Sequence, residues 1–290
     1  DSSVKATHSL ETVLKLEEFD YLSLRFTLMN VMENLISNYK EIIALTTIKR
    51  YDLSTFIHSL NVSILSMYFS SKLGFAKDDC LDIGIAALFH DIGKLHISRK
   101  IIKKPERLTE EEFSAMRSHV ILGAEILLRY TDNLGVLPIV VCFEHHLRYD
   151  LQGYPKVSFA RAPHTASLVA SICDVYDALN QRRDYKNDYP PDVIYNLMMR
   201  ERGTLFDPNL LDAFFKIMGV WPIGSIVSLN DNRIAVIREE NEDDIFSPKV
   251  EVILPKEKRE FINMKETKDA IKIEKFVNPW KEGKDYLALI

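Results

Sequence analysis

Histidine and aspartate residues recur along this chain at a spacing that suits metal binding. The chain has eight histidines, and five of them join two aspartates in one series with steps of 26 to 32 residues: His58, the pair His90-Asp91, His119, the pair His145-His146, and Asp174. Two helices of about a dozen residues with short loops take up roughly that length. A chain that runs out on one helix and back on the next would bring every member to one layer of a bundle. Seven nitrogen and oxygen ligands suit two divalent metal ions, especially where a carboxylate bridges them.

The segment HDIGK at residues 90–94 contains the first specific signal. His90 and Asp91, as neighbours on one helix, would point about 100° apart, so the histidine can bind one metal while the aspartate spans two. Lys94 lies one turn after His90 on the same side, where its charge could hold a substrate phosphate. Taken alone, such a segment is more often a helix end with a glycine cap and a solvated lysine. The other four positions of the series favour the metal site.

Two further signals lie later in the chain. Adjacent His145 and His146 on an apolar helix cannot both be satisfied cheaply by hydrogen bonds, which favours a metal site. Asp174 and Asp177 share one helix face because they are three residues apart. We expect Asp174 to bind the metal and Asp177 to orient a histidine.

Apolar periodicity predicts helices for most of the chain and strands near its end. Thr109 with Glu112 forms a capping box, Pro138 and Pro163 suit helix starts, and Asp207 precedes a further helix. The predicted helices cover residues 9–46, 52–74, 79–92, 109–127, 138–146, 162–180 and 207–219. After these, segments 226–229 and 234–237 predict a hairpin, and 250–254 predicts a third strand.

These elements predict a helical bundle with N-terminal helices and a small C-terminal β appendage. The expected divisions are an N-terminal helical segment at 1–48, a metal-dependent domain at 49–218, the β appendage at 219–254, and a tail at 255–290 for which no element is predicted. The N-terminal segment is either a layer packed on the core or a signalling helix. In the second case it would form a homodimer.

Composition limits the classes of partner. At 290 residues, one domain with an appendage is expected. The net charge of -5 argues against a general binder of DNA or RNA, and no apolar run reaches the roughly 18 residues of a membrane span. The cysteines form no CxxC pattern, which predicts small buried thiols in a reduced, cytosolic protein: Cys80, Cys142 and Cys173. The chain begins with Asp1 rather than Met, as a piece of a longer protein would.

The chain resembles the HD-GYP domain of bacterial cyclic di-GMP signalling, a branch of the HD phosphohydrolases. The segments that carry the resemblance are HDIGKLHISRKIIKKPERLTEEEFSAMRSHVILGAEIL (90–127), HHLRYDLQGYP (145–155) and DVYDALNQRRDY (174–185). The resemblance covers roughly residues 49–218, and WPIGSIVSL (221–229) is similar to a segment that often follows such domains. It implies an all-α, HD-type helical bundle in a bacterial cytoplasmic protein.

The resemblance also implies a set of site residues. The cofactor would be two divalent metal ions, with iron preferred and manganese as the alternative. One metal would take His58, His90, Asp91 and Asp174, and the other would take Asp91, His119, His145 and His146, with Asp91 as the bridge. The catalytic residues would be Asp91 and Lys94. Contacts to substrate would fall to Lys94, Tyr154, Arg183 and Lys186.

Several positions depart from the family pattern. Ser54 stands where some relatives have a glutamate that binds a third metal, so we expect two metals. Leu147 replaces an acidic residue after the histidine pair, Leu151 and Gln152 replace Gly and Ser in the GYP loop, and Leu168 replaces an arginine. These changes keep the predicted metal ligands and alter the fit of the substrate.

The implied function is a metal-dependent phosphodiesterase. It would open cyclic di-GMP to linear pGpG, and further to GMP, by attack of a hydroxide that bridges the metals. Two alternatives stay open. One is a cyclic-dinucleotide receptor without useful turnover, which the altered GYP loop favours. The other is an HD phosphohydrolase of another nucleotide, such as cyclic GMP-AMP.

Overall fold

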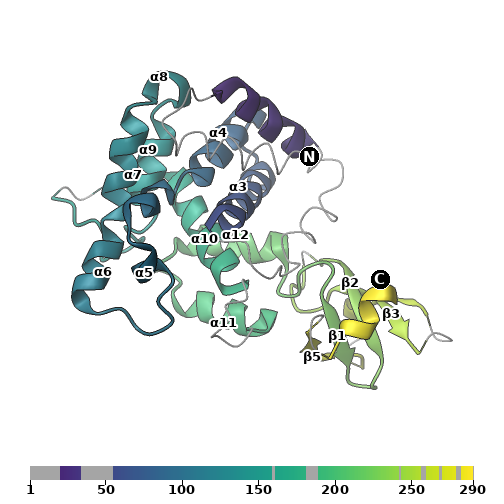
Figure 1. Ribbon diagram of the computed structural model, residues 1–290. Helices are drawn as coiled ribbons and strands as arrows, with labels where there is room; N and C mark the ends of the chain where they lie inside the picture. Colours follow the sequence, from purple (N-terminus) through teal and green to yellow (C-terminus); the bar gives the residue numbers. More distant parts are fainter. Residues whose placement is uncertain are drawn as a thin grey trace.

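The computed structural model describes residues 20–33, 55–158, 161–180, 189–241, 243–255, 259–267, 270–278 and 282–289. A bundle of helices comes first, and a β-sheet follows it along the chain (Figure 1). Residues 21–33 are helical. The later helices are α3 (Thr55–Lys72), α4 (Lys77–Leu88), η1 (Ile92–His96, a 3-10 helix), α5 (Arg99–Ile102), α6 (Glu110–Arg117), α7 (His119–Leu128), α8 (Thr131–Leu134), α9 (Leu137–Glu144), α10 (Thr165–Asn180), α11 (Pro191–Arg200) and α12 (Pro208–Met218).

Local sequence signals explain several helix starts. The capping box is confirmed, because the Thr109 hydroxyl accepts from the Glu112 N–H and the Glu112 carboxylate accepts from the Thr109 N–H. The Asp207 carboxylate caps α12, and Pro138 lies in the first turn of α9. Pro163 lies two residues before α10 rather than at its first position, so that part of the prediction is wrong.

Two predicted helices end earlier than expected and a third is interrupted, each time next to a candidate metal ligand. The helix predicted to reach residue 92 ends at Leu88, the helix predicted over 109–127 breaks at Ser118, and α9 ends at Glu144. In all three places a histidine ring bonds through Nδ1 to a backbone carbonyl of the turn before it. Such a bond satisfies a carbonyl that the end of a helix leaves free. His90 and Asp91 therefore lie in a turn and not on a common helix.

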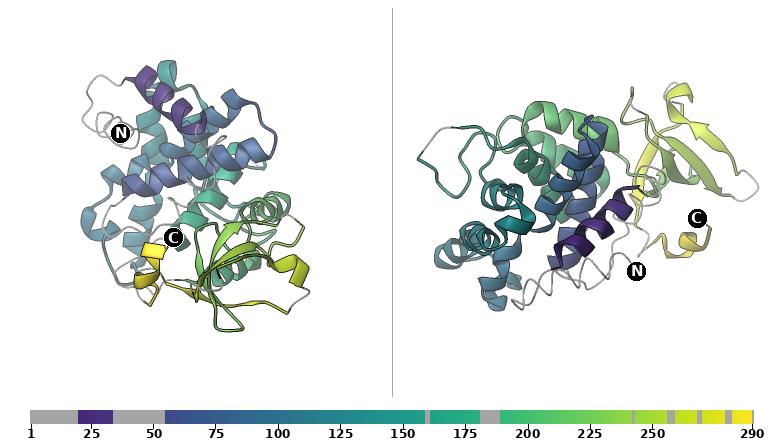
Figure 2. Two further views of the ribbon diagram at one scale, coloured as in Figure 1. Left: turned by 90° about the vertical axis from the view of Figure 1, so that its right-hand side faces the viewer. Right: turned by 90° about the horizontal axis from the view of Figure 1, so that it is seen from above.

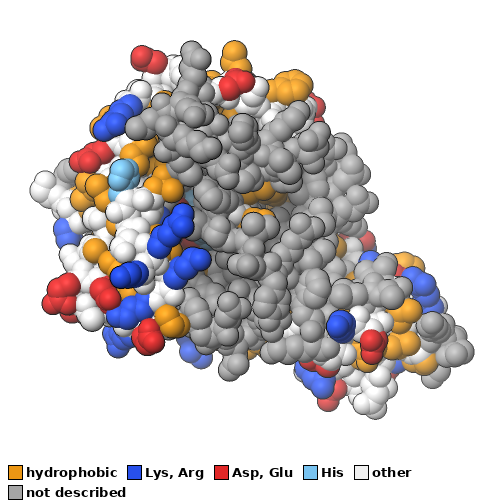
Figure 3. All heavy atoms as spheres, viewed as in Figure 1, with side chains coloured by type: hydrophobic (Ala, Val, Ile, Leu, Met, Phe, Trp, Pro, Cys, Tyr) orange, Lys and Arg blue, Asp and Glu red, His pale blue; other side chains and the backbone are white. Residues whose placement is uncertain are grey.

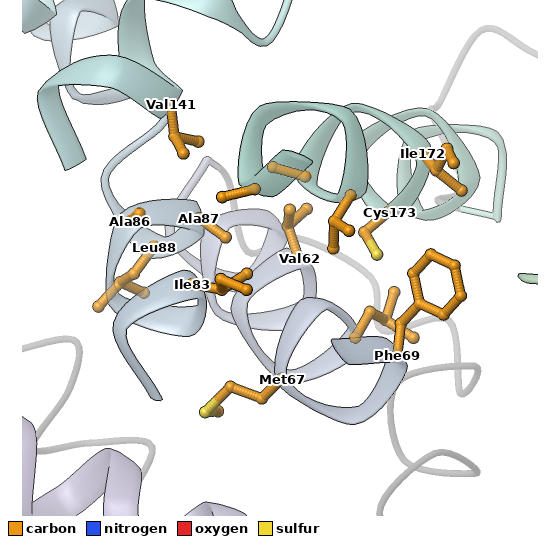
Figure 4. Packing of buried hydrophobic residues seen from close by; sticks show 14 of the residues in the cluster. Val62, Met67, Phe69, Ile83, Ala86, Ala87, Leu88, Val141, Ile172 and Cys173 are labelled. Atoms are coloured by element: carbon orange, nitrogen blue, oxygen red, sulfur yellow. The ribbon is translucent and has the colours of Figure 1, made fainter. Parts of the chain in front are cut away.

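The main core lies between α3, α4, α9 and α10 (Figure 4). Val62 and Phe69 of α3 pack with Ile83 of α4 and Ile172 of α10, and all four side chains are buried. The Ser63 hydroxyl donates to the carbonyl of Gly84 and joins α3 to α4. This packing fixes the helices that carry the candidate ligands. All three cysteines are free and buried, as expected.

The β-strands form one antiparallel sheet, which has five strands within the described residues, in the order β4-β3-β2-β1-β5. Its strands are β1 (Ile226–Leu229), β2 (Ile234–Glu239), β3 (Lys249–Leu254), β4 (Phe261–Asn263) and β5 (Ile273–Val277). The predicted hairpin and third strand are confirmed. The two edge strands were not predicted, and they come from the segment treated as a tail. The boundary expected at residue 254 therefore falls inside the sheet.

The sheet packs against the end of the helical bundle (Figure 2). Tyr195 of α11 contacts the rings of Phe215 in α12 and Phe246 in the loop between β2 and β3. The Val220 N–H donates to the carbonyl of Ile245. The chain is thus mostly helical with an antiparallel sheet at its C-terminal end. No helix in the described part of the chain is both long and apolar enough to cross a membrane.

The predicted helix over residues 9–46 is borne out at 21–33. The rest of that helix, the expected boundary at residue 49 and Ser54 lie outside the described residues.

Candidate metal centre

All seven candidate ligands lie together. Among the described residues, the nitrogen and oxygen atoms of two groups lie within 4.8 Å of one another, and both groups contain Asp91: Asp91, His119, His145 and His146; and His58, His90 and Asp91. A third group joins His90, His145 and Asp174. Asp174 Oδ1 also lies 2.9 Å from His58 Nε2. The carboxylate of Asp91 therefore lies between two sets of histidines, as a bridging ligand would.

The histidine rings are held by their outer nitrogens. The Nδ1 atoms of His90, His119 and His145 lie 2.7, 2.7 and 2.9 Å from backbone carbonyl oxygens. A carbonyl accepts a hydrogen bond and cannot donate one, so each Nδ1 carries the proton and each Nε2 offers a lone pair to the interior. Such bonds fix the tautomer and the orientation of metal-binding histidines.

His58 is held in a similar way by a carboxylate. Its Nδ1 lies 2.7 Å from Asp177 Oδ2, and Asn61 Nδ2 donates to Asp177 Oδ1 at 2.9 Å. Asp177 is therefore placed to orient a histidine, as expected from its spacing to Asp174. The role of Asn61 was not foreseen, because an asparagine on a helix carries no signal until its partner is known.

The buried polar atoms fit a bound cation. In the part of the chain that the structure describes, His90 Nε2 and Asp91 Oδ1 are buried and have no hydrogen-bond partner. His119 Nε2 and His145 Nε2 face each other at 3.4 Å, although both offer lone pairs. Buried acceptors without donors cost free energy. A divalent cation would satisfy these atoms, so the residues present fit the metals that the resemblance implies.

Protonation in the cluster also suits metal binding. Burial lowers the pKa of His119 and His145 and brings the pKa of His146 to about 4, so these rings are neutral at pH 7. Burial raises the pKa of the Asp91 carboxyl, but the nearby Lys94 and His90 outweigh it and hold that pKa well below its usual range. Neutral imidazole and ionised carboxylate are the forms that bind metals.

His58 differs from the other rings. Burial lowers its pKa, but hydrogen bonds to the Asp174 and Asp177 carboxylates outweigh burial and raise the pKa to about 10. The metal-free protein therefore holds a proton on His58 at neutral pH. Its Nε2 must lose that proton before it can bind a metal.

Two glycines let backbone segments approach the cluster. A Cβ at Gly93 would lie 1.9 Å from the carbonyl oxygen of His119, and a Cβ at Gly153 would lie 1.9 Å from the carbonyl oxygen of His146. Gly153 belongs to the GYP loop, where the Tyr154 N–H donates to the His146 carbonyl at 2.9 Å. The glycine thus allows the loop to lie directly on the histidine pair.

Replacing Gly153 with alanine is expected to push the GYP loop away from His146. A misplacement of about 1 Å can lower a rate roughly 100-fold, so we expect kcat/KM to fall at least about tenfold while the protein still folds. Steady-state kinetics and a melting curve measure both effects. Gly135→Ala is the control, because a Cβ there meets nothing within 4 Å, and its strain comes only from the positive φ of 71°. Equal losses of kcat/KM in both variants would contradict the proposed role.

Aromatic rings lead from the cluster to the surface. The Tyr154 ring lies 4.7 Å from the His146 ring and 6.4 Å from the ring of Phe113 in α6. The Arg117 guanidinium lies 4.8 Å from the centre of the Phe113 ring, and Phe113 is 41% exposed. Neither Phe113 nor Arg117 was predicted from the sequence as a site residue, because α6 is far from the GYP loop along the chain.

Of the other residues expected to contact substrate, the structure describes only Lys94. Lys94 Nζ donates to Asp91 Oδ2 at 2.5 Å, and its side chain is 26% exposed. Arg183 and Lys186 lie outside the described residues. Figure 3 shows further Lys and Arg side chains over the region of α5 and α6, where Arg99, Lys100 and Lys103 are exposed.

The departures from the family pattern have structural consequences. Leu147 is buried with 4% exposure, so a core side chain replaces the acidic one. Leu151 has φ of 61°, in the left-handed region that favours glycine. Leucine at this position costs about 1 kcal/mol or more in backbone strain, which explains why glycine is usual there.

Comparison with known proteins agrees with the site. Residues 55–179 match the HD domain family. The chain is 34% identical over 214 residues to a cyclic di-GMP phosphodiesterase of Pseudomonas aeruginosa, covering 73% of this chain and 50% of that protein. It is 31% identical over 203 residues to a cyclic di-GMP phosphodiesterase of Thermotoga maritima, covering 69% and 52%. A 3'3'-cGAMP-specific phosphodiesterase of Vibrio cholerae is 28% identical, covering 67% and 38%.

The chain spans about half the length of the first two of these curated relatives. Among solved structures, an HDG"Y"P protein from Bdellovibrio bacteriovorus has a TM-score of 0.62 at 18% identity, covering 73% of this chain and 69% of that one. At this identity the likeness concerns the fold alone. The family match includes all seven candidate ligands, and the HD and GYP motifs occur in order. The chain therefore belongs to the HD-domain family, in its HD-GYP branch.

Proposed function

We propose that this chain is a phosphodiesterase that hydrolyses cyclic di-GMP to linear pGpG, and further to GMP. The observation that carries the proposal is the position of Asp91 between two buried sets of histidines, whose Nε2 atoms face inward. The cofactor would be two divalent metal ions, with iron preferred over manganese. Nitrogen and carboxylate ligands without thiolates favour these metals over structural zinc.

The ligands would divide as the groups do. His58, His90, Asp91 and Asp174 would hold one metal, and Asp91, His119, His145 and His146 would hold the other. When bound, two such metals lower the pKa of water and offset charge on a phosphodiester. The protein contributes a buried cluster from which bulk water is excluded, because His90, Asp91 and His145 are at most 3% exposed.

Lys94 would hold the substrate phosphate. Its ammonium forms an ion pair with Asp91 at the partly exposed edge of the cluster. There it would add a third positive charge to those of the two metals and contact the non-bridging phosphate oxygens. We further propose that Arg183 and Lys186 bind the phosphates and bases, and that Tyr154 closes one side of the substrate site. The contact of Tyr154 with His146 supports its role.

Phe113 is expected to stack with a substrate base. Aromatic stacking of a nucleobase contributes about 1–3 kcal/mol, and Phe113 is exposed next to Tyr154. We expect Phe113→Ala to raise KM by roughly tenfold with little change in kcat. Phe261→Ala is the matched control, because Phe261 is an exposed phenylalanine in β4. An unchanged KM for Phe113→Ala would remove Phe113 from the substrate site.

The chain is also proposed to act in the bacterial cytoplasm and to form a homodimer through its N-terminal helices. Leu22 and Phe26 lie one turn apart on the helix at 21–33 and are 76% and 61% exposed, which supports a contact with an apolar partner surface.

Two alternatives have their own support. The strained Leu151 and buried Leu147 favour a receptor that binds the dinucleotide without useful turnover. The Vibrio cholerae relative favours hydrolysis of cyclic GMP-AMP. The test measures kcat/KM for cyclic di-GMP, cyclic GMP-AMP and cyclic di-AMP with the same metal-loaded protein. The proposal predicts the highest value for cyclic di-GMP. A higher value for cyclic GMP-AMP, or tight binding of all three without product, would overturn it.

A further inference from the structure

Glu144 is a buried carboxylate whose contacts join two ligand-bearing helices. It is the last residue of α9, directly before the pair His145-His146, and it is 5% exposed. An ionised side chain at such a position is costly unless several donors satisfy it. The donors here come from the far end of the GYP loop and from the start of α10.

Three groups donate to Glu144. Its Oε2 accepts from the His164 N–H at 2.7 Å and from the Ser167 hydroxyl at 2.9 Å, and its Oε1 accepts from the Arg161 guanidinium. His164 is the residue before α10, and Ser167 is in its first turn. A carboxylate at the start of a helix satisfies free N–H groups and interacts favourably with the helix dipole. Glu144 thus caps α10 from another helix.

These contacts act on the same side of α10 as the candidate ligand Asp174. Ser167 and Asp174 are seven residues apart, about two turns, and so lie on one helix face. Glu144 joins the C-terminal end of α9 to the start of α10. The histidine pair directly follows α9, and Asp174 lies further along α10. The hydrogen bonds of Glu144 therefore fix the position of Asp174, along the axis of α10, relative to His145 and His146.

We propose that Glu144 is a positioning residue for the metal centre: its bonds to His164 and Ser167 hold the histidine pair and Asp174 at the separation that binding of both metals requires. The proposal rests on the proposed function only for the presence of metals. It makes no use of turnover.

The test is titration of the metal-free 290-residue chain with Mn(II), followed by calorimetry and by the electron paramagnetic resonance signal of the bound ions. Loss of a group that orients metal ligands typically lowers metal affinity about 10- to 100-fold, and we expect that loss for Glu144→Ala. Glu144→Gln keeps an oxygen that can accept from both His164 and Ser167, so it should bind Mn(II) about as tightly as the original chain.

Glu251→Ala is the matched control. Glu251 is 6% exposed in β3 and accepts from Arg238 and Arg259, so it is a buried, arginine-paired glutamate far along the chain from the cluster. Its replacement should lower the melting temperature and leave Mn(II) affinity unchanged. If Glu144→Ala behaved in the same way, Glu144 would be purely structural. If Glu144→Gln bound Mn(II) as weakly as Glu144→Ala, the hydrogen bonds to α10 would not be the cause.

Ser167→Ala protects the test against failure of Glu144→Ala to fold. It removes one of the two bonds to Oε2, and we expect about threefold weaker Mn(II) binding. An unchanged affinity would overturn the proposal. A chain that binds Mn(II) and does not hydrolyse cyclic di-GMP would refute the proposed function and leave this inference standing. A chain that binds neither Mn(II) nor Fe(II) would refute both.

Discussion

Replacing Asp91 with alanine is expected to remove bound metal and phosphodiesterase activity together. Among the described residues, Asp91 is the one that the group of His119, His145 and His146 shares with the group of His58 and His90. Its two oxygens face histidine Nε2 atoms, at 3.3 Å from His90 and 3.4 Å from His119. Without this carboxylate each metal loses a ligand and the two sites lose their connection. We expect turnover to fall by a factor on the order of 10³ or more.

Metal content per chain and turnover measured on the same sample test this expectation. Asp91→Asn is the second variant, because it keeps the shape of the side chain and removes the charge. Asp177→Asn is the graded comparison, since Asp177 orients His58 and its loss should lower metal affinity only about 10- to 100-fold. Two metals per chain and full activity in Asp91→Ala would show that Asp91 is not a bridge.

Replacing Lys94 with alanine is expected to separate metal binding from catalysis. The Lys94 ammonium lies on Asp91, so its positive charge opposes the binding of cations, and its removal should leave metal content unchanged. The same charge would stabilise the phosphate during attack. Removing one such group typically lowers kcat about 10²- to 10³-fold.

Lys100→Ala is the control for Lys94→Ala. Lys100 is an exposed lysine of α5 in the same part of the chain, and its replacement should change kcat little. If Lys94→Ala lost its metals, the lysine would act on the structure of the cluster rather than on the substrate. If its kcat were unchanged, another cation would hold the phosphate.

The convergence of the seven candidate ligands could be predicted because their spacing matches pairs of helices. The local geometry could not. Sequence periodicity places His90 and Asp91 on one helix, whereas the bond between the His90 ring and the Ala87 carbonyl ends the helix before them. The spacing of apolar residues does not indicate whether a histidine side chain bonds to the backbone of its own helix, because the residue type is the same in both cases.

The sheet shows the same limit for another reason. Strands β1 to β3 are apolar and bounded by turn residues, so they stand out in the sequence. Strands β4 and β5 are short edge strands with exposed residues, and edge strands are typically short and charged. Glu144 is a third case. Its role depends on partners about 20 residues away across the GYP loop, and no local pattern marks that contact.

Hydrolysis of cyclic di-GMP by anaerobically prepared protein, loaded with Fe(II) or Mn(II), tests the central claim most directly. Chromatography separates cyclic di-GMP, pGpG and GMP, and metal content is measured on the same sample. The proposed function predicts that pGpG appears and that it is absent with Asp91→Ala. No product from a chain that holds two metals would contradict it.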